Sequence, residues 1–146
     1  LTLDECLDVV ATRARGEAAR RGVKLALASG GSVDVSLPGR VASLTILVLQ
    51  SLTQNALEAS APESTVRLSA SEVAGGVVFE VADAGPGLSP EVQARLFAPV
   101  GSGKAEGSGL GLALSQLLAQ QAGGRIELVR SDANGSVFRL VIPNAG

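Results

Sequence analysis

The chain has 146 residues, 46% of them hydrophobic, and a formal net charge of −2 at pH 7, which suits one domain with a single hydrophobic core. A nearly neutral chain with three Phe, no Tyr and no Trp lacks the basic surface and stacking rings of nucleic-acid binders, so we expect no nucleic-acid partner. Cys6 is the only cysteine and there is no His, which excludes an intrachain disulfide, a thiolate zinc site and a histidine general base.

Apolar periodicity divides the chain into helices and strands. Thr2 and Glu5 form a capping-box pattern at the start of the first predicted helix, Gly22 suits its end, and Pro38 is placed to open a second, longer helix. Helices and mostly antiparallel strands in this order predict an α/β two-layer sandwich, a mixed sheet packed against helices. The predicted elements are helices at 1–22, 38–60, from 89 onward and at 110–122, and strands at 23–28, 33–37, 65–71, 77–82, 125–130 and 136–142.

The chain contains no Met and begins at Leu1, so we expect residues 1–146 to form one domain excised from a longer protein. Its longest apolar stretch, at residues 44–49, is far too short to span a bilayer, and no signal peptide opens the chain. We therefore expect a cytoplasmic domain without membrane contact of its own, within a parent protein that can still be anchored in a membrane.

A glycine-rich motif stands where a loop at residues 99–108 meets the helix predicted at 110–122. Closely spaced glycines let a backbone approach phosphate oxygens, and the free amides of the following helix attract negative charge. The motif is not a Rossmann fingerprint, because no parallel strand leads into it, and it lacks the Gly-Lys-Ser/Thr ending of a Walker A loop. Taken alone, the motif is equally compatible with glycines that only let two parts of the backbone pack closely. Its residues are Gly107, Ser108, Gly109, Leu110, Gly111 and Leu112.

Two further features offer polar groups to a ligand. Asp83 follows a predicted strand and precedes a glycine-rich turn, where it can accept a hydrogen bond from a ligand's amino group; an ordinary tight turn would look the same. Asn55 lies on one face of the second helix with Ser51 and Glu58. Its amide oxygen is a hard ligand that suits Mg²⁺, although a solvated helix face is the simpler interpretation of this pattern alone.

In this order, the three features resemble the Bergerat ATP-binding fold of the GHKL superfamily, and most closely the catalytic domain of bacterial sensor histidine kinases. Residues 55–59 look like the N box, 83–87 like the first glycine box, 96–99 like the F box and 107–112 like the second glycine box. Residues 123–126 and 135–138, and Pro143, match the closing strands. The resemblance covers essentially the whole chain.

The resemblance implies a role for each matching residue. Asn55 would coordinate the Mg²⁺ that bridges the ATP phosphates, and Asp83 would bind the adenine amino group, with Ser136 helping through a water. Residues 99–108 would form a mobile ATP lid, with Lys104 facing the phosphates. The remaining ATP-binding residues would be Gly85, Gly87 and Leu88 around the base, Phe97 as the anchor of the lid, and Gly107, Ser108, Gly109, Leu110, Gly111 and Leu112 around the phosphates.

The implied activity is transfer of the γ-phosphoryl group of Mg-ATP to a histidine on a separate dimerisation domain, and indirectly to a response regulator. Ser51 stands where hydrolysing relatives carry a Glu that activates water, so the sequence favours transfer over hydrolysis. Ser51 and Glu58 also depart from the usual kinase pattern, as do Ala84 and Ala122. Two alternatives stay open: a serine kinase of the anti-sigma-factor type, and a degenerate scaffold that only binds nucleotide or a partner.

Overall fold

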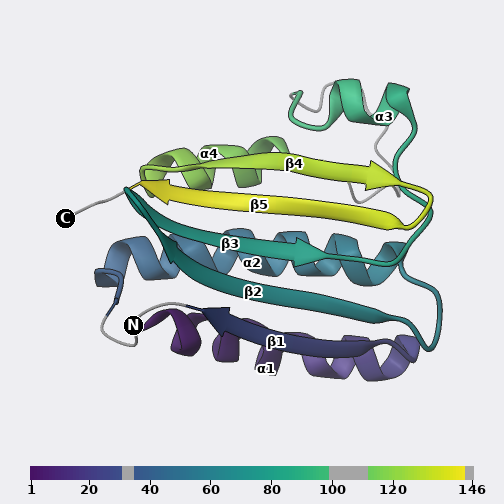
Figure 1. The fold of residues 1–146 in the computed structure, drawn as a ribbon, viewed down its shortest axis with the longest axis horizontal. Helices are drawn as coiled ribbons and strands as arrows, with labels where there is room; N and C mark the ends of the chain where they lie inside the picture. The colour runs from purple at the N-terminus through teal and green to yellow at the C-terminus, as the bar shows by residue number, and fades with distance from the viewer. Residues whose placement is uncertain (31–34, 99–111, 144–146) are drawn as a thin grey trace.

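The computed structural model describes residues 1–30, 35–98 and 112–143. These residues form one five-stranded sheet in the order β1-β2-β3-β5-β4, in which β1 and β2 are parallel and the other neighbours are antiparallel (Figure 1). The mixed, mostly antiparallel sheet confirms the predicted fold class. The elements are α1 (Leu3–Arg21), β1 (Lys24–Gly30), α2 (Gly39–Ala59), β2 (Thr65–Val73), β3 (Gly76–Ala82), α3 (Pro90–Arg95), α4 (Ala113–Gln121), β4 (Arg125–Asp132) and β5 (Gly135–Pro143).

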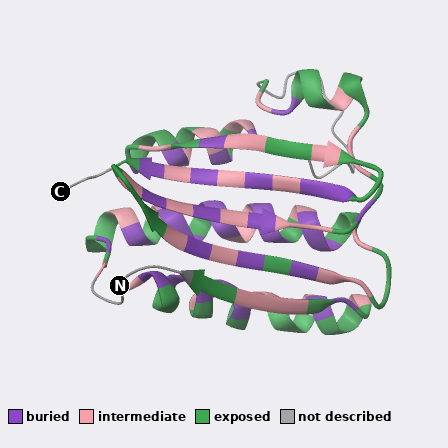
Figure 2. Cartoon of the chain, viewed as in Figure 1, coloured by how far each residue is buried: buried purple, intermediate pink, exposed green. Residues whose placement is uncertain are grey.

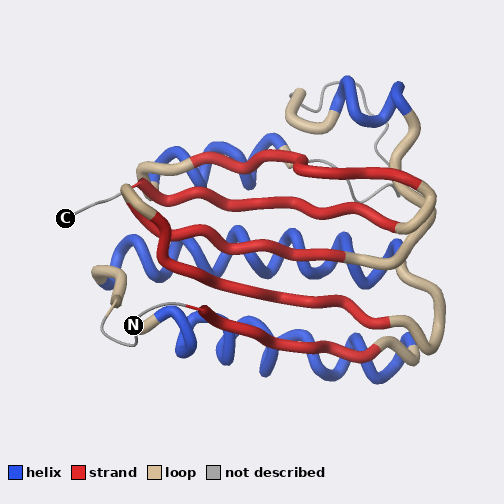
Figure 3. The backbone as a smooth tube through the Cα atoms, viewed as in Figure 1, coloured by secondary structure: helices blue, strands red, loops and turns tan. Residues whose placement is uncertain are grey.

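Helices α1, α2 and α4 cover one face of the sheet, and α2 packs between the other two (Figures 1 and 3). The core lies between these two layers, because buried side chains alternate along β3 and β5 toward the helices (Figure 2). Its largest fully buried side chains include Phe79, Leu49 and Leu52. The opposite face of the sheet carries polar pairs such as Glu80 with Arg139, whose Nε donates to the Glu80 carboxylate over 2.8 Å.

Local signals in the sequence are confirmed at the ends of α1. The backbone N–H of Glu5 donates to Thr2 Oγ1 over 3.1 Å, and the N–H of Thr2 donates to the Glu5 carboxylate over 2.8 Å. Gly22 ends the helix in the left-handed region at φ 71°, which glycine adopts without a steric penalty. The predicted hairpin between β2 and β3 also forms, with Ala74 and Gly75 at its turn.

Two element predictions need correction. The strand predicted at 33–37 is, in its described part, only an isolated antiparallel bridge between Ser36 and Thr2, because the segment pairs with the first residues of the chain. The helix predicted at 110–122 begins at Ala113 and ends at Gln121. Just before this start, the N–H of Leu112 donates to the carbonyl of Leu96 over 3.2 Å.

That hydrogen bond also joins the residue that follows α3 to the residue that precedes α4. Leu96 and Leu112 are both buried, so the two ends of the segment between α3 and α4 meet in the core. Helix α3 itself stands apart from the helical layer at one corner of the molecule (Figure 3). No helix within the described ranges is both long enough and apolar enough to cross a membrane.

Candidate nucleotide-binding site

Asp83 lies at the end of β3, beside the first residues of β5, and its side chain is fixed by backbone donors. Its Oδ1 accepts hydrogen bonds from the N–H of Gly85 over 2.8 Å and from the N–H of Ser136 over 3.2 Å. The N–H of Asp83 donates to the carbonyl of Ser136 over 2.9 Å, which extends the β3–β5 ladder by one residue. Among the described residues no donor reaches Oδ2, so this half-buried carboxylate keeps one acceptor oxygen for a ligand.

The turn after Asp83 runs close to two other backbones. A Cβ on Gly85 would lie 2.5 Å from the carbonyl oxygen of Ala59, at the end of α2. A Cβ on Gly87 would lie 2.3 Å from the carbonyl oxygen of Asp132, and Gly87 also has a φ of 85°. The glycines therefore fit the turn tightly between the end of α2 and the end of β4. Leu88, also predicted here, is half-buried against the core.

Ser136 lies almost wholly buried at the start of β5, and its hydroxyl is 2.8 Å from the hydroxyl of Ser131 on β4. Ser131 Oγ also accepts a hydrogen bond from the N–H of Leu88 over 2.8 Å. The structure thus brings Ser136 and Leu88 together with Asp83, at the right-hand end of the sheet in Figure 1. Ser131 escaped the sequence analysis because a Ser near a hairpin turn gives no functional signal.

Asn55 lies one helical turn before Ala59 on α2, and Ala59 contacts the Gly85 turn. Its Nδ2 is buried and, within the described residues, has no hydrogen-bond partner. An unsatisfied buried polar atom costs about 1–3 kcal/mol, so its presence calls for an explanation. Rotation of the amide exchanges its nitrogen and oxygen, so the same position can offer an acceptor. Glu58, three residues on, is exposed and accepts a hydrogen bond from Gln54 over 2.9 Å.

The remaining predicted residues belong to the segment that leads into α4. Lys104, Gly107, Ser108, Gly109, Leu110 and Gly111 lie outside the described residues. Phe97 is half-buried against the core, and Leu112 is fully buried as the N-cap residue of α4. Within the described residues no side chain caps this helix, and the backbone donors of a helix's first turn attract an anion.

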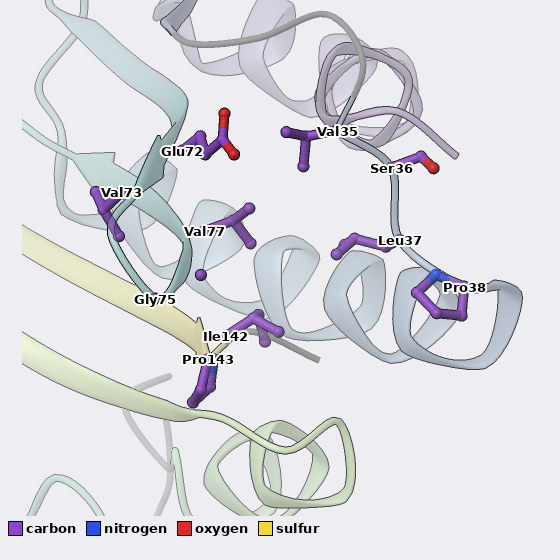
Figure 4. A pocket seen from close by; sticks show the side chains of 11 residues that line it. Val35, Ser36, Leu37, Pro38, Glu72, Val73, Gly75, Val77, Ile142 and Pro143 are labelled. Atoms are coloured by element: carbon purple, nitrogen blue, oxygen red, sulfur yellow. The ribbon is translucent and has the colours of Figure 1, made fainter. Parts of the chain in front are cut away.

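A different pocket, of about 320 Å³, lies at the opposite end of the sheet (Figure 4). The β2–β3 hairpin, the segment before α2 and the end of β5 line it, with mostly apolar side chains such as Val35, Val77 and Ile142. Among the described residues that line it, Glu72 is the one ionisable residue, and none of them is a predicted site residue. The described residues contain no group of three or more His, Cys, Asp or Glu placed to hold a metal ion.

Comparison with known proteins identifies the family of this chain. Residues 40–146 match the family model "Histidine kinase-, DNA gyrase B-, and HSP90-like ATPase". The C4-dicarboxylate transport sensor protein DctB of Rhizobium meliloti is 40% identical over 100 residues, which are 67% of this chain and 16% of DctB. Sensor histidine kinase ZraS of Escherichia coli is 36% identical over 96 residues, 66% of this chain and 21% of ZraS.

Among solved structures, the catalytic domain of histidine kinase ThkA has a similar fold. It superimposes with a TM-score of 0.81 and 22% identity, covering 98% of this chain and 92% of the ThkA chain. The chain thus spans about a fifth or less of the length of these two curated relatives, but nearly the whole length of the solved ThkA catalytic domain.

Proposed function

Because the chain belongs to the family of histidine kinase-, DNA gyrase B- and HSP90-like ATPases, we propose that it binds Mg-ATP and transfers the γ-phosphoryl group to a histidine. It is an ATP-binding catalytic domain of the two-component sensor kinase type. The acceptor histidine belongs to a separate dimerisation domain, since this chain contains no His. From that histidine the phosphoryl group passes to a response regulator.

The geometry of Asp83 is the observation that supports this proposal most directly. Two backbone N–H groups hold Oδ1, so the direction of the carboxylate is set before a ligand arrives. Oδ2 is left to accept a hydrogen bond from the exocyclic amino group of adenine. A guanine base presents a carbonyl oxygen at that position, which would face the carboxylate without a proton between them. The site therefore prefers adenine.

The same arrangement brings Ser136 to the base. Its hydroxyl is buried one residue from the β4–β5 turn, and its backbone N–H fixes Asp83. A water held between the Ser136 hydroxyl and the base would contact a ring nitrogen next to the amino group. Gly85 and Gly87 allow the turn, and with it Leu88, to lie against the edge of the base.

Asn55 is the residue we propose for Mg²⁺. The fit rests on its buried amide, whose nitrogen has no partner among the described residues and whose oxygen can take the same position. Mg²⁺ commonly takes few protein ligands and completes its octahedron with phosphate oxygens and water. When bound, the ion neutralises charge on the phosphates.

The phosphates would lie at the N-terminus of α4. The backbone donors of its first turn, which no described side chain caps, and the positive end of its dipole favour an anion. We assign Lys104 and the glycines of residues 107–111 to the same phosphates. Phosphoryl transfer depends mainly on positioning and charge neutralisation, so a chain without His can perform it. The acceptor imidazole supplies the attacking nitrogen.

Transfer to a separate acceptor tests the proposal. The domain is mixed with labelled ATP, Mg²⁺ and a dimerisation domain that carries a phosphoacceptor histidine, taken from a sensor histidine kinase related to this chain. We expect label on the acceptor that is lost in acid and kept in alkali, as an N–P bond requires, and none when the acceptor His is replaced by Gln. Label that survives acid would indicate a serine acceptor. Tight ATP binding with no transfer to any tested acceptor would support the scaffold alternative.

A further inference from the structure

Ser131, on β4, lies between two of the predicted site residues, although it belongs to none of the sequence motifs itself. Its Oγ accepts the N–H of Leu88 over 2.8 Å and lies 2.8 Å from Ser136 Oγ. The first contact reaches the turn after β3, and the second reaches β5. One hydroxyl on β4 therefore joins the segment that would cover the base to the serine that would contact it.

We infer that Ser131 is a positioning residue for the adenine base, an inference that rests on the proposed function. Its hydrogen bond to Leu88 holds the turn after β3 in place. Its hydrogen bond to Ser136 holds the hydroxyl of Ser136, the residue whose backbone N–H bonds Asp83. This role does not involve the phosphates or the transferred group. The loss of Ser131 should therefore weaken adenine binding without slowing transfer at saturating ATP.

The two hydrogen bonds of Ser131 can run in the direction that a positioning role requires. Leu88 N–H can only donate, so Ser131 Oγ is the acceptor in that contact. Ser131 then has its own proton to donate, and Ser136 Oγ lies at hydrogen-bond distance to receive it. Either hydroxyl can be the donor in this contact; when Ser131 donates, the Ser136 proton is free to donate toward the base or a bridging water. Hydrogen bonds that point the same way along a chain strengthen one another.

The hairpin itself does not need the Ser131 side chain. The backbones of β4 and β5 already pair Ser131 with Ser136 and Asp132 with Gly135, and Asp132 Oδ1 accepts the N–H of Asn134 over 2.8 Å. Leu88, in contrast, lies outside every strand. Within the described residues it is held by Ser131 at its N–H and by Gln93 at its carbonyl. The hydroxyl therefore matters more for the turn than for the fold.

The pair Ser131→Thr and Ser131→Val tests this inference, because Thr and Val have the same shape and differ only in the hydroxyl. Both suit a strand, so a difference between them reports the hydroxyl. We expect Ser131→Thr to bind ADP within about twofold of wild type. Ser131→Val should bind it roughly fivefold to tenfold more weakly, the usual effect of one net hydrogen bond. The KM for ATP should rise by the same factor, with kcat within about twofold.

The same two substitutions at Ser69 are the matched control. Ser69 is half-buried on the open face of β2, and its hydroxyl makes no hydrogen bond with any described residue. Both Ser69 variants should bind ADP like wild type. Should either Ser131 variant fold poorly, Ser131→Ala removes the same hydroxyl without β-branching and should match Ser131→Val.

Two outcomes would overturn the inference, and they differ in what they leave standing. If Ser131→Val binds ADP as tightly as Ser131→Thr while Asp83→Asn binds far more weakly, Ser131 has no positioning role and the proposed function stands. If the wild-type chain binds no adenine nucleotide, the proposed function fails and this inference with it. A fall in kcat with unchanged KM would also contradict the inference, because it would place Ser131 in the transfer step.

Discussion

Replacing Asp83 by Asn tests the adenine assignment most sharply, because it keeps the shape of the side chain and changes one acceptor to a donor. Oδ1 must accept the N–H groups of Gly85 and Ser136, and Oδ2 must accept the adenine amino group. An amide has only one oxygen. If that oxygen faces the two backbone donors, its NH₂ meets the amino group of adenine; if the amide turns round, the NH₂ meets the backbone donors.

The size of the effect follows from the bond that is lost. A hydrogen bond to a charged group contributes about 1.5–3 kcal/mol, and the mismatched donors add to the loss. We therefore expect ADP binding to weaken by at least 2–3 kcal/mol, roughly 30-fold to 150-fold in Kd. The fold should lose far less, because the variant can keep Oδ1 bonded to Gly85 and Ser136 and turn its NH₂ toward the empty site.

Calorimetric titration with ADP in the presence of EDTA measures this effect without any contribution from a metal. Asp8→Asn is the control, since Asp8 is exposed on α1 and the substitution is the same; it should bind like wild type. Thermal unfolding of both variants checks that affinity is compared between folded proteins. Unchanged ADP affinity in a folded Asp83→Asn protein would refute the adenine assignment.

Four further predictions concern Asn55, two glycines and Cys6. Asn55→Ala should reduce affinity for Mg-ATP roughly tenfold or more but leave metal-free ADP binding unchanged, as calorimetry with and without EDTA would show; it should cost little stability, because the buried amide nitrogen has no partner to lose among the described residues. Gly85→Ala should destabilise by about 1–3 kcal/mol in urea unfolding, because its Cβ would lie 2.5 Å from the Ala59 carbonyl. Gly16→Ala, with nothing within 4 Å, should instead stabilise α1 by up to about 1 kcal/mol. Burial raises the pKa of the Cys6 thiol, so iodoacetamide at pH 8 should label it only when urea unfolds the chain.

The sequence predicted those parts of the fold that local interactions determine. The capping box of Thr2 and Glu5 involves residues three apart, and Gly22 is selected by its own φ, so both could be recognised without a structure. The alternation of apolar residues along β3 and β5 likewise records which face is buried. These elements have the bounds that the pattern suggested, within a residue or two.

The errors arose where the partner is distant in sequence. Residues 35–37 have the alternation of a strand, but their described partners are Leu1 and Thr2, which offer only one bridge. Helix α4 starts at Ala113, later than its pattern suggests, and Leu112 before it is bonded to Leu96, 16 residues earlier. Ser131 was missed for the same reason, because its importance comes from Leu88, which lies 43 residues before it.

The choice between phosphoryl transfer and hydrolysis depends on what α2 offers beside Asn55. Hydrolysis needs a carboxylate that takes a proton from water, and the position one turn before Asn55 is Ser51, which cannot act as that base. Glu58 lies on the same side of the helix, but it is exposed and its carboxylate is bonded to Gln54. A histidine acceptor needs no such base, since its imidazole attacks through a neutral nitrogen with a free lone pair. The residues of α2 therefore favour an acceptor that brings its own nucleophile, because the water-activating carboxylate is absent from this helical turn.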